Sequence, residues 1–193
     1  MHRLPAAPRP SRALGGAAVA AALVLTVAPA ARADDDDLFG IPIVRVALGP
    51  AIHMPATATF ALDLDVGAGI LFGDEGSFAV APELGYSFDG FGSHAFNLTV
   101  GVGAGVPMVY ALYQPRLLAG TLARDDLDDG ARHGTVGMRN ALGLHMLLDM
   151  FSLEVGHQFM SAGGGLEHDV HVLIGTNPAA AVFLFGKMLD GLR

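Results

Sequence analysis

The stretch 95-AFNLTVGVGAGV-106 decides the fold, because large apolar residues and small or polar residues alternate along it without a break. The apolar positions are Phe96, Leu98, Val100, Val102, Ala104 and Val106. The positions between them are Asn97, Thr99, Gly101, Gly103 and Gly105. Successive side chains of a β-strand point to opposite faces of the sheet, so this stretch predicts a strand with one apolar face.

The same alternation recurs through most of the chain. It predicts strands at 43–53, 58–72, 77–88, 95–106, 109–121, 134–147, 151–160 and 168–176. These strands are eight in number, and a single-chain membrane barrel usually closes with an even number of strands. We therefore predict an all-β, antiparallel, up-and-down transmembrane β-barrel of about eight strands. Asn177-Pro178 then predicts a short helix over 178–190, with a ninth strand as the alternative.

The connections predict which end of the barrel faces which compartment. The turns after the second, fourth and sixth strands are short, whereas 89–94, 122–133 and 161–167 form longer loops. An antiparallel barrel places these two sets at opposite ends, with short turns periplasmic and longer loops outside.

The N-terminal residues predict export. Residues 1–33 carry Arg3, Arg9 and Arg12, then the apolar run 13–28 and an Ala-Arg-Ala cleavage site, which is the pattern of a cleaved signal peptide. The apolar run is short for a membrane anchor, which needs roughly 20 residues. We divide the rest into an acidic tail at 34–42, the barrel at 43–176 and a C-terminal segment at 177–193.

Composition excludes several classes of function. The formal net charge is -8 and becomes more negative when the four arginines of the signal peptide leave, so the chain is a poor candidate for binding nucleic acid. The absence of cysteine excludes disulfides, thiolate metal sites and thiol catalysis. Charged residues make up 16% of the chain, below the roughly 25% of soluble domains.

Two kinds of barrel fit this alternation. A soluble, lipocalin-like lipid carrier would turn its apolar face inward, and a membrane barrel would turn it outward. The polar face consists mostly of Gly, Ala, Ser and Thr with isolated charges, and Lys187 is the one lysine of the chain. A water-facing surface is normally rich in Lys and Glu, whereas the narrow interior of an eight-stranded barrel suits small residues, so we favour the membrane barrel.

In the membrane barrel, the isolated charges of the polar face lie inside. The predicted interior residues are Arg45, His53, Asp63, Asp65, Glu83, Arg116, Arg139, His145, Glu154, Asp169 and His171. Buried charges must be paired and hydrogen-bonded, so these residues predict a structural salt-bridge network. The alternative is a narrow polar pathway or gate for a small solute.

This whole pattern resembles the small outer-membrane barrels of Gram-negative bacteria, the eight-stranded OmpA- and OmpX-like proteins. The resemblance rests on the signal peptide, on strands such as FALDLDVGAGILF and AFNLTVGVGAGV, and on the order of turns and loops over 43–176. It implies Sec-type export, contact with outer-membrane lipids, assembly by the barrel-assembly machinery, and a structural, adhesive or porin-like role. The chain ends in LDGLR, whereas such proteins commonly end in a strand with a terminal aromatic residue.

We expect no catalytic, cofactor or metal site. The alternative is an enzyme resembling the lipid A deacylases, with His157 and Ser161 on one strand face, but about 13 Å of strand rise would separate them. His168 and His171 point to opposite faces of a strand and cannot share a metal ion. The acidic loop 122–133 can attract a divalent cation, but a solvated loop is the simpler interpretation.

Overall fold

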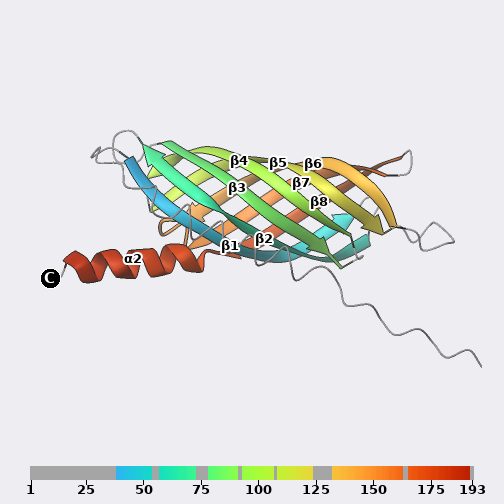
Figure 1. Cartoon of the computed structure of the whole chain (residues 1–193). Helices are drawn as coiled ribbons and strands as arrows, with labels where there is room; N and C mark the ends of the chain where they lie inside the picture. The colour runs from blue at the N-terminus through green and yellow to red at the C-terminus, as the bar shows by residue number, and fades with distance from the viewer. Residues whose placement is uncertain are drawn as a thin grey trace, which may run out of the picture.

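The described part of the computed structural model covers residues 38–53, 57–72, 78–90, 93–106, 108–123, 132–162 and 165–191. It forms a barrel of eight strands followed by one helix (Figure 1). The elements are β1 (Leu38–His53), β2 (Thr57–Phe72), β3 (Phe78–Asp89), β4 (His94–Val106), β5 (Val109–Ala123), β6 (Arg132–Met146), β7 (Phe151–Ala162), β8 (Gly165–Thr176) and α2 (Pro178–Gly191). The predicted signal peptide, the aspartate run 34–37 and loop residues 124–131 lie outside the described residues.

Every strand pairs antiparallel with its neighbour in sequence, and β8 pairs with β1 from Val46↔Thr176 to His53↔Asp169. This confirms the predicted closed barrel of eight antiparallel strands. The segment after β8 is a helix, so the alternative of a ninth strand is wrong. We call the end of the barrel where β8 gives way to α2 the helix end, and the opposite end the loop end.

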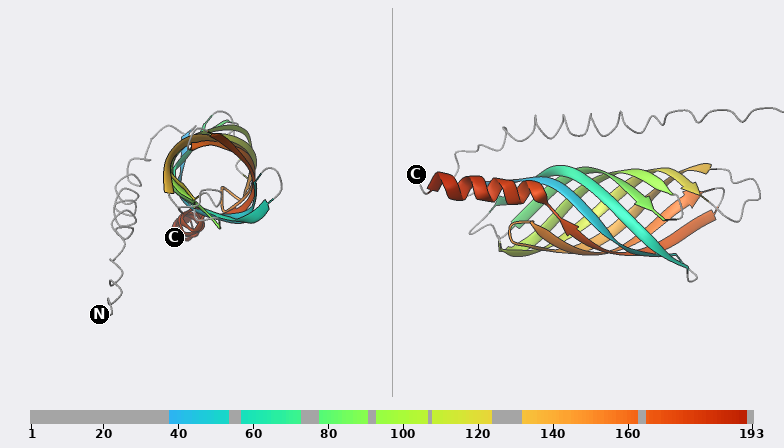
Figure 2. Two further views of the ribbon diagram at one scale, coloured as in Figure 1. Left: turned by 90° about the vertical axis from the view of Figure 1, so that its right-hand side faces the viewer. Right: turned by 90° about the horizontal axis from the view of Figure 1, so that it is seen from below.

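The apolar face of each strand points outward. Val136, Phe96 and Leu142 are 66%, 65% and 61% exposed, whereas Arg45 and Arg116 on the opposite strand faces are at most 1% exposed. This orientation of the strand faces excludes the alternative of a soluble lipid carrier, because such a carrier would have an apolar interior. The left view of Figure 2 shows the ring of strands end-on, and the buried side chains of Arg45 and Arg116 lie on the strand faces that point into this ring.

Three prolines interrupt the hydrogen-bonded ladder without changing its register. Pro50, Pro82 and Pro115 each keep a partner on one neighbouring strand and lack one on the other. Proline has no N–H to donate to the ladder, which explains the gaps. The register is the same on both sides of Pro50, Leu48↔Ile174 and Ala51↔His171, so Pro50 does not introduce a bulge.

Two predicted boundaries are wrong. β1 begins at Leu38, because 38–42 pairs with 68–72 of β2 and extends the strand into the segment that we predicted as an acidic tail. The predicted long loop 161–167 is a connection of two residues, because Ser161↔Leu166 and Ala162↔Gly165 continue the β7–β8 ladder. The connections therefore do not divide into short and long sets by barrel end as predicted.

Helix α2 is fixed to the barrel through Asn177. The Asn177 Oδ1 accepts hydrogen bonds from Ala180 N at 3.2 Å and from Val44 N of β1 at 3.0 Å, so it caps the helix and holds it to the barrel wall. Beyond this anchor the apolar side chains of Val182, Phe185 and Met188 are exposed. No helix in the described ranges is long and apolar enough to cross a membrane.

We predict that Gly103→Ala destabilises the barrel and that Gly69→Ala does not. A Cβ at Gly103 would lie 2.0 Å from the backbone oxygen of Ala111, whereas a Cβ at Gly69 meets side-chain atoms of Ile43 and Ile41 at ordinary distances of 3.6 and 3.8 Å. Forcing an extra group into a packed site costs about 1–3 kcal/mol. Urea unfolding in detergent, followed by circular dichroism, measures both variants, and equal stabilities would contradict the prediction.

Candidate functional site

Part of the interior at the helix end is apolar. This buried apolar cluster consists of Ile41, Ile43, Leu71, Ala79, Ala81, Tyr110 and Leu112, together with Ala180 of α2. Leu148 and Met150, from the turn between β6 and β7, pack against this cluster. This end of the bore is therefore closed by a small hydrophobic core.

The middle of the interior holds three buried arginines from different strands. Arg45 of β1 donates from Nη1 to Glu83 at 3.1 Å and to Glu154 at 3.4 Å. Arg116 of β5 donates to Asp63 at 3.0 Å, to Asp65 at 2.9 Å and to Glu154 at 2.6 Å. Arg45 and Arg116 thus each bind carboxylates from two other strands, which ties separate parts of the barrel wall together.

Shared carboxylates join these arginines into one network. Glu154 bridges Arg45 and Arg116, and Asp63 bridges Arg116 and Arg139. Arg139 also donates to the Oε1 of Gln158, from Nε at 3.0 Å and from Nη2 at 2.8 Å. All of these side chains are at most 4% exposed, so the network fills the bore and separates its two ends.

Toward the loop end the network continues through polar groups. Gln158 donates to Asp169 at 3.3 Å, and Asp169 Oδ1 lies 2.6 Å from His53 Nδ1. A small pocket here, lined among others by Asp89, Arg139 and His171, has room for about one water molecule. Within the described part of the chain, neither ring nitrogen of His171 has a hydrogen-bond partner, so a water in this pocket would satisfy it.

At the helix end, the turn between β6 and β7 folds inward. Leu147, Leu148 and Asp149 have φ values of 53°, 56° and 70°, in the left-handed region that costs residues other than glycine roughly 1–2 kcal/mol each. Asp149 offsets this cost with hydrogen bonds from Arg45 at 3.3 Å, from Asn177 at 2.9 Å and from His145 Nδ1. The turn therefore connects the charged network to the cap of α2.

These contacts set the protonation of Asp149. Burial alone would raise the pKa of this carboxyl, but Arg45 and the hydrogen bond from His145 outweigh burial and bring the pKa down to about 2. Asp149 is therefore ionised wherever the barrel is folded at ordinary pH.

The structure brings most of the predicted interior residues together. Arg45, Asp63, Asp65, Glu83, Arg116, Arg139 and Glu154 form the network itself; His145 joins it through Asp149, and Asp169 with His53 through Gln158. His171 is buried beside the network, but among the described residues neither of its ring nitrogens forms a hydrogen bond.

The predicted network did not include Asp149, Gln114, Gln158 and Asn177, which also bond within it. The alternation places Gln114 and Gln158 on the inward strand faces, but being uncharged they were not counted in a network predicted from buried charges. Asp149 and Asn177 lie outside the strands, where alternation gives no signal.

We predict that Arg116→Met lowers the free energy of unfolding by about 3–5 kcal/mol, as expected when a buried charge loses its partner. Asp65 is the most affected carboxylate, because Arg139 still binds Asp63 and Arg45 still binds Glu154. Asp65→Asn in the Arg116→Met background should therefore recover much of the loss. Urea unfolding of the single and double variants measures this, and a cost below about 1 kcal/mol would match an exposed ion pair instead.

We predict a second, pH-dependent effect at Asp149. Because folding lowers the pKa of Asp149 to about 2 from its ordinary value near 3.8, the stabilisation is complete above pH 4 and disappears as the pH falls from about 4 to 2. The stability difference between the protein and its Asp149→Asn variant should therefore shrink by about 2 kcal/mol over that range. A difference that stays constant with pH would contradict the assignment.

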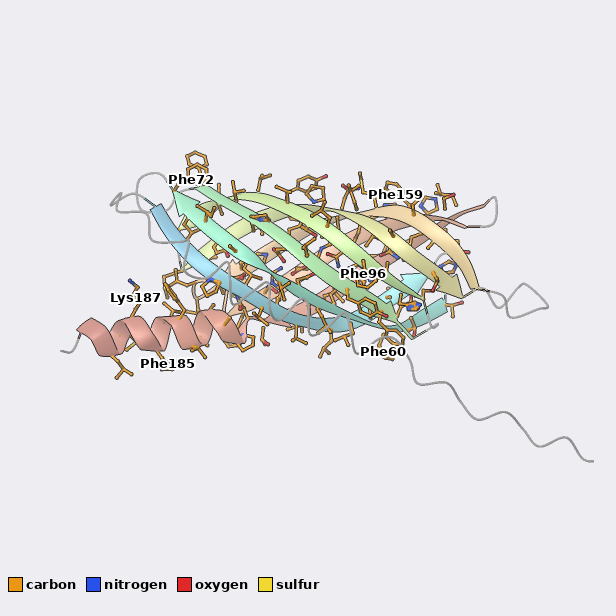
Figure 3. All side chains as sticks on the ribbon, viewed as in Figure 1. Phe60, Phe72, Phe96, Phe159, Phe185 and Lys187 are labelled. Carbon is orange, nitrogen blue, oxygen red and sulfur yellow. The ribbon has the colours of Figure 1, made fainter. Side chains whose placement is uncertain are left out.

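The outer wall carries aromatic side chains near both ends. Phe72 and Phe78 lie at the helix end with ring centroids 5.7 Å apart, and Phe151 begins β7 at the same end. Toward the loop end, Phe60 packs on Phe88 and Tyr86 on Phe96, and Phe159 lies on β7; Figure 3 shows Phe72 on the half of the barrel near α2 and Phe60, Phe96 and Phe159 on the other half. Aliphatic side chains such as Val100, Leu142 and Val155 cover the wall between these two groups.

A cluster of polar side chains interrupts this apolar wall. His157 of β7 and His168 of β8 point outward, with His168 Nδ1 3.3 Å from His157 Nε2. Asn140 is the register partner of His157 and accepts a hydrogen bond from the Tyr113 hydroxyl at 2.7 Å. His157 thus contacts a second histidine across the β7–β8 ladder, whereas Ser161 lies opposite Leu166, four residues further along β7.

The comparisons with known proteins assign no family. No family model matches the chain, and no curated protein matches it. A solved structure titled "De novo design of transmembrane beta-barrels" is 12% identical, with a TM-score of 0.38, over 70% of this chain and 95% of the designed one. A likeness of this size does not establish a function.

Proposed function

We propose that this chain is an outer-membrane β-barrel protein of the OmpA- and OmpX-like class, with a sealed interior and a structural or adhesive role at the cell surface. The observation that carries the proposal is the pairing of an apolar outer wall with a buried network of ion pairs. The proposal includes Sec-type export, contact with outer-membrane lipids and insertion by the barrel-assembly machinery. It includes no catalytic step, cofactor or metal requirement.

The outer wall supports the membrane location. A closed barrel leaves no unpaired strand edge, which is one of the two ways a chain can span a bilayer without exposing backbone groups to lipid. An outward apolar band flanked by aromatic residues is the pattern of outer-membrane barrels. Phe72 and Phe78 at one end and Phe60 and Phe96 toward the other follow this pattern.

The interior supports a sealed barrel over a porin-like one. Arg116 and Glu154 lie in the middle of the bore and are at most 2% exposed, and the apolar cluster around Leu112 closes the helix end. An ion crossing this bore would have to break several charge-assisted hydrogen bonds at once. We therefore favour a structural role over transport of a small solute.

The longest connection between strands supports an orientation. This connection, 124–131, lies at the loop end, whereas the other connections do not separate by length between the two ends. Small outer-membrane barrels place their longer loops outside and short turns in the periplasm. The helix end is therefore the periplasmic end in our proposal.

We predict that Val100→Arg prevents stable membrane insertion and that Gly134→Arg does not. Val100 is 48% exposed near the middle of β4, where an arginine facing lipid costs about 2–4 kcal/mol. Gly134 lies at the loop end, with nothing within 4 Å of its added Cβ, where the same change costs about 0–1 kcal/mol. Cell fractionation and a gel-mobility shift between boiled and unboiled samples measure folded protein in the membrane.

Wild-type protein that stays soluble without detergent would contradict the membrane location. Conductance in a planar bilayer tests the sealed interior separately, because a folded and inserted wild-type barrel should give no regular current steps. Reproducible single-channel steps would instead favour the narrow porin-like role.

A further inference from the structure

The pair formed by His157 and His168 belongs to neither the interior network nor the apolar wall. The two residues lie on neighbouring strands: His157 opposes Val170 and His168 opposes Phe159, so the imidazoles meet diagonally across the β7–β8 hairpin. The ring centroids are 5.4 Å apart with an angle of 13° between the ring planes. Outward polar groups on a barrel wall need a partner other than lipid tails.

The distance between the two nitrogens fits a shared metal ion. Two imidazole nitrogens bound at 2.0–2.1 Å to one tetrahedral ion lie about 3.3 Å apart. The observed separation of His157 Nε2 and His168 Nδ1 is 3.3 Å. Imidazole is also a side chain that suits Cu²⁺, Ni²⁺ and Zn²⁺.

The surroundings keep the pair accessible to water. His157 is exposed, His168 is half-buried, and Phe159 packs beside His157 at 6.2 Å between ring centroids. Phe159 belongs to the aromatic group near the loop end, and outer-membrane barrels carry girdles of aromatic residues at both membrane–water interfaces. A hydrated ion can therefore reach the imidazoles from the outer side.

We propose that His157 and His168 form a two-histidine site for a divalent transition metal on the outer wall of the barrel. Among the described residues, no group of three or more His, Asp or Glu side chains is arranged to hold a metal ion, so the remaining positions on this ion belong to water or to a group brought by lipid. The metal would link β7 to β8 within the β7–β8 hairpin. The site does not depend on membrane insertion, because it lies within one hairpin of the folded barrel.

The test uses Cu²⁺ and the refolded full barrel in detergent. Electron paramagnetic resonance should show one Cu²⁺ bound through two imidazole nitrogens in the wild-type protein. His157→Gln and His168→Gln should each reduce the affinity at least tenfold and leave one nitrogen or none. His94→Gln is the matched control, because His94 lies on the other side of the barrel, in contact with Tyr86, and its loss should change neither value.

A direct hydrogen bond between the two imidazoles is the competing explanation of their contact. In that case the wild-type protein would bind Cu²⁺ through one nitrogen or none, with the same affinity as the two variants, and the proposal would be wrong. The boiled and unboiled gel shift confirms that each variant is folded before its binding is compared. If Cu²⁺ does not bind here, the proposed membrane function is unaffected, because that proposal is tested separately by fractionation and insertion.

Discussion

The rest of the structure depends on the pairing of charges inside a bore too narrow for bulk water. An unpaired buried ion costs several kcal/mol, so each guanidinium needs carboxylates within reach. Arg45, Arg116 and Arg139 come from β1, β5 and β6, and their partners come from β2, β3 and β7. A slip of one residue in any of these strands would move its charges to the outer wall. The network therefore fixes both the register and the closure of the barrel.

The helix end extends this constraint beyond the strands. Asn177 joins three parts of the molecule, because it caps α2, bonds the backbone of β1 at Val44 and Pro42, and donates to Asp149. Asp149 in turn accepts a hydrogen bond from Arg45 and stabilises a backbone turn whose left-handed φ angles are unfavourable. The seam between β8 and β1, the terminal helix and the interior are thus coupled through two side chains that lie outside the strands.

The interior of the barrel is polar and its outer wall is apolar. The interior satisfies polar groups with one another, so the outer wall must supply an apolar surface to whatever surrounds it. In the proposed membrane location, the aromatic residues near the two ends of the barrel would lie where the surroundings change from hydrocarbon to water. His157 and His168 depart from this division, and in the proposed membrane location their position beside Phe159 would leave them in reach of water.

Alternation alone determined much of this protein. In a strand every second side chain shares a face, so AFNLTVGVGAGV and its counterparts defined the strands and their two faces. The small residues and isolated charges of the polar face then predicted that this face points inward. The same rule placed Arg45, Arg116 and Glu154 in the interior, and the Asn-Pro start predicted α2. The rule is local, so it could extend neither to 38–42 nor through the glycines of the β7–β8 hairpin, where the partner strand decides whether the ladder continues.

Only the tertiary structure decided which charges pair, because the partners of Arg45 are up to 109 positions away in sequence and meet only when the sheet closes. It also decided that Asp149 folds inward, since the left-handed turn is stable only through contacts with Arg45, His145 and Asn177. The meeting of His157 and His168 has the same cause: periodicity gives the face of each residue, and only the register between two strands gives the distance across them.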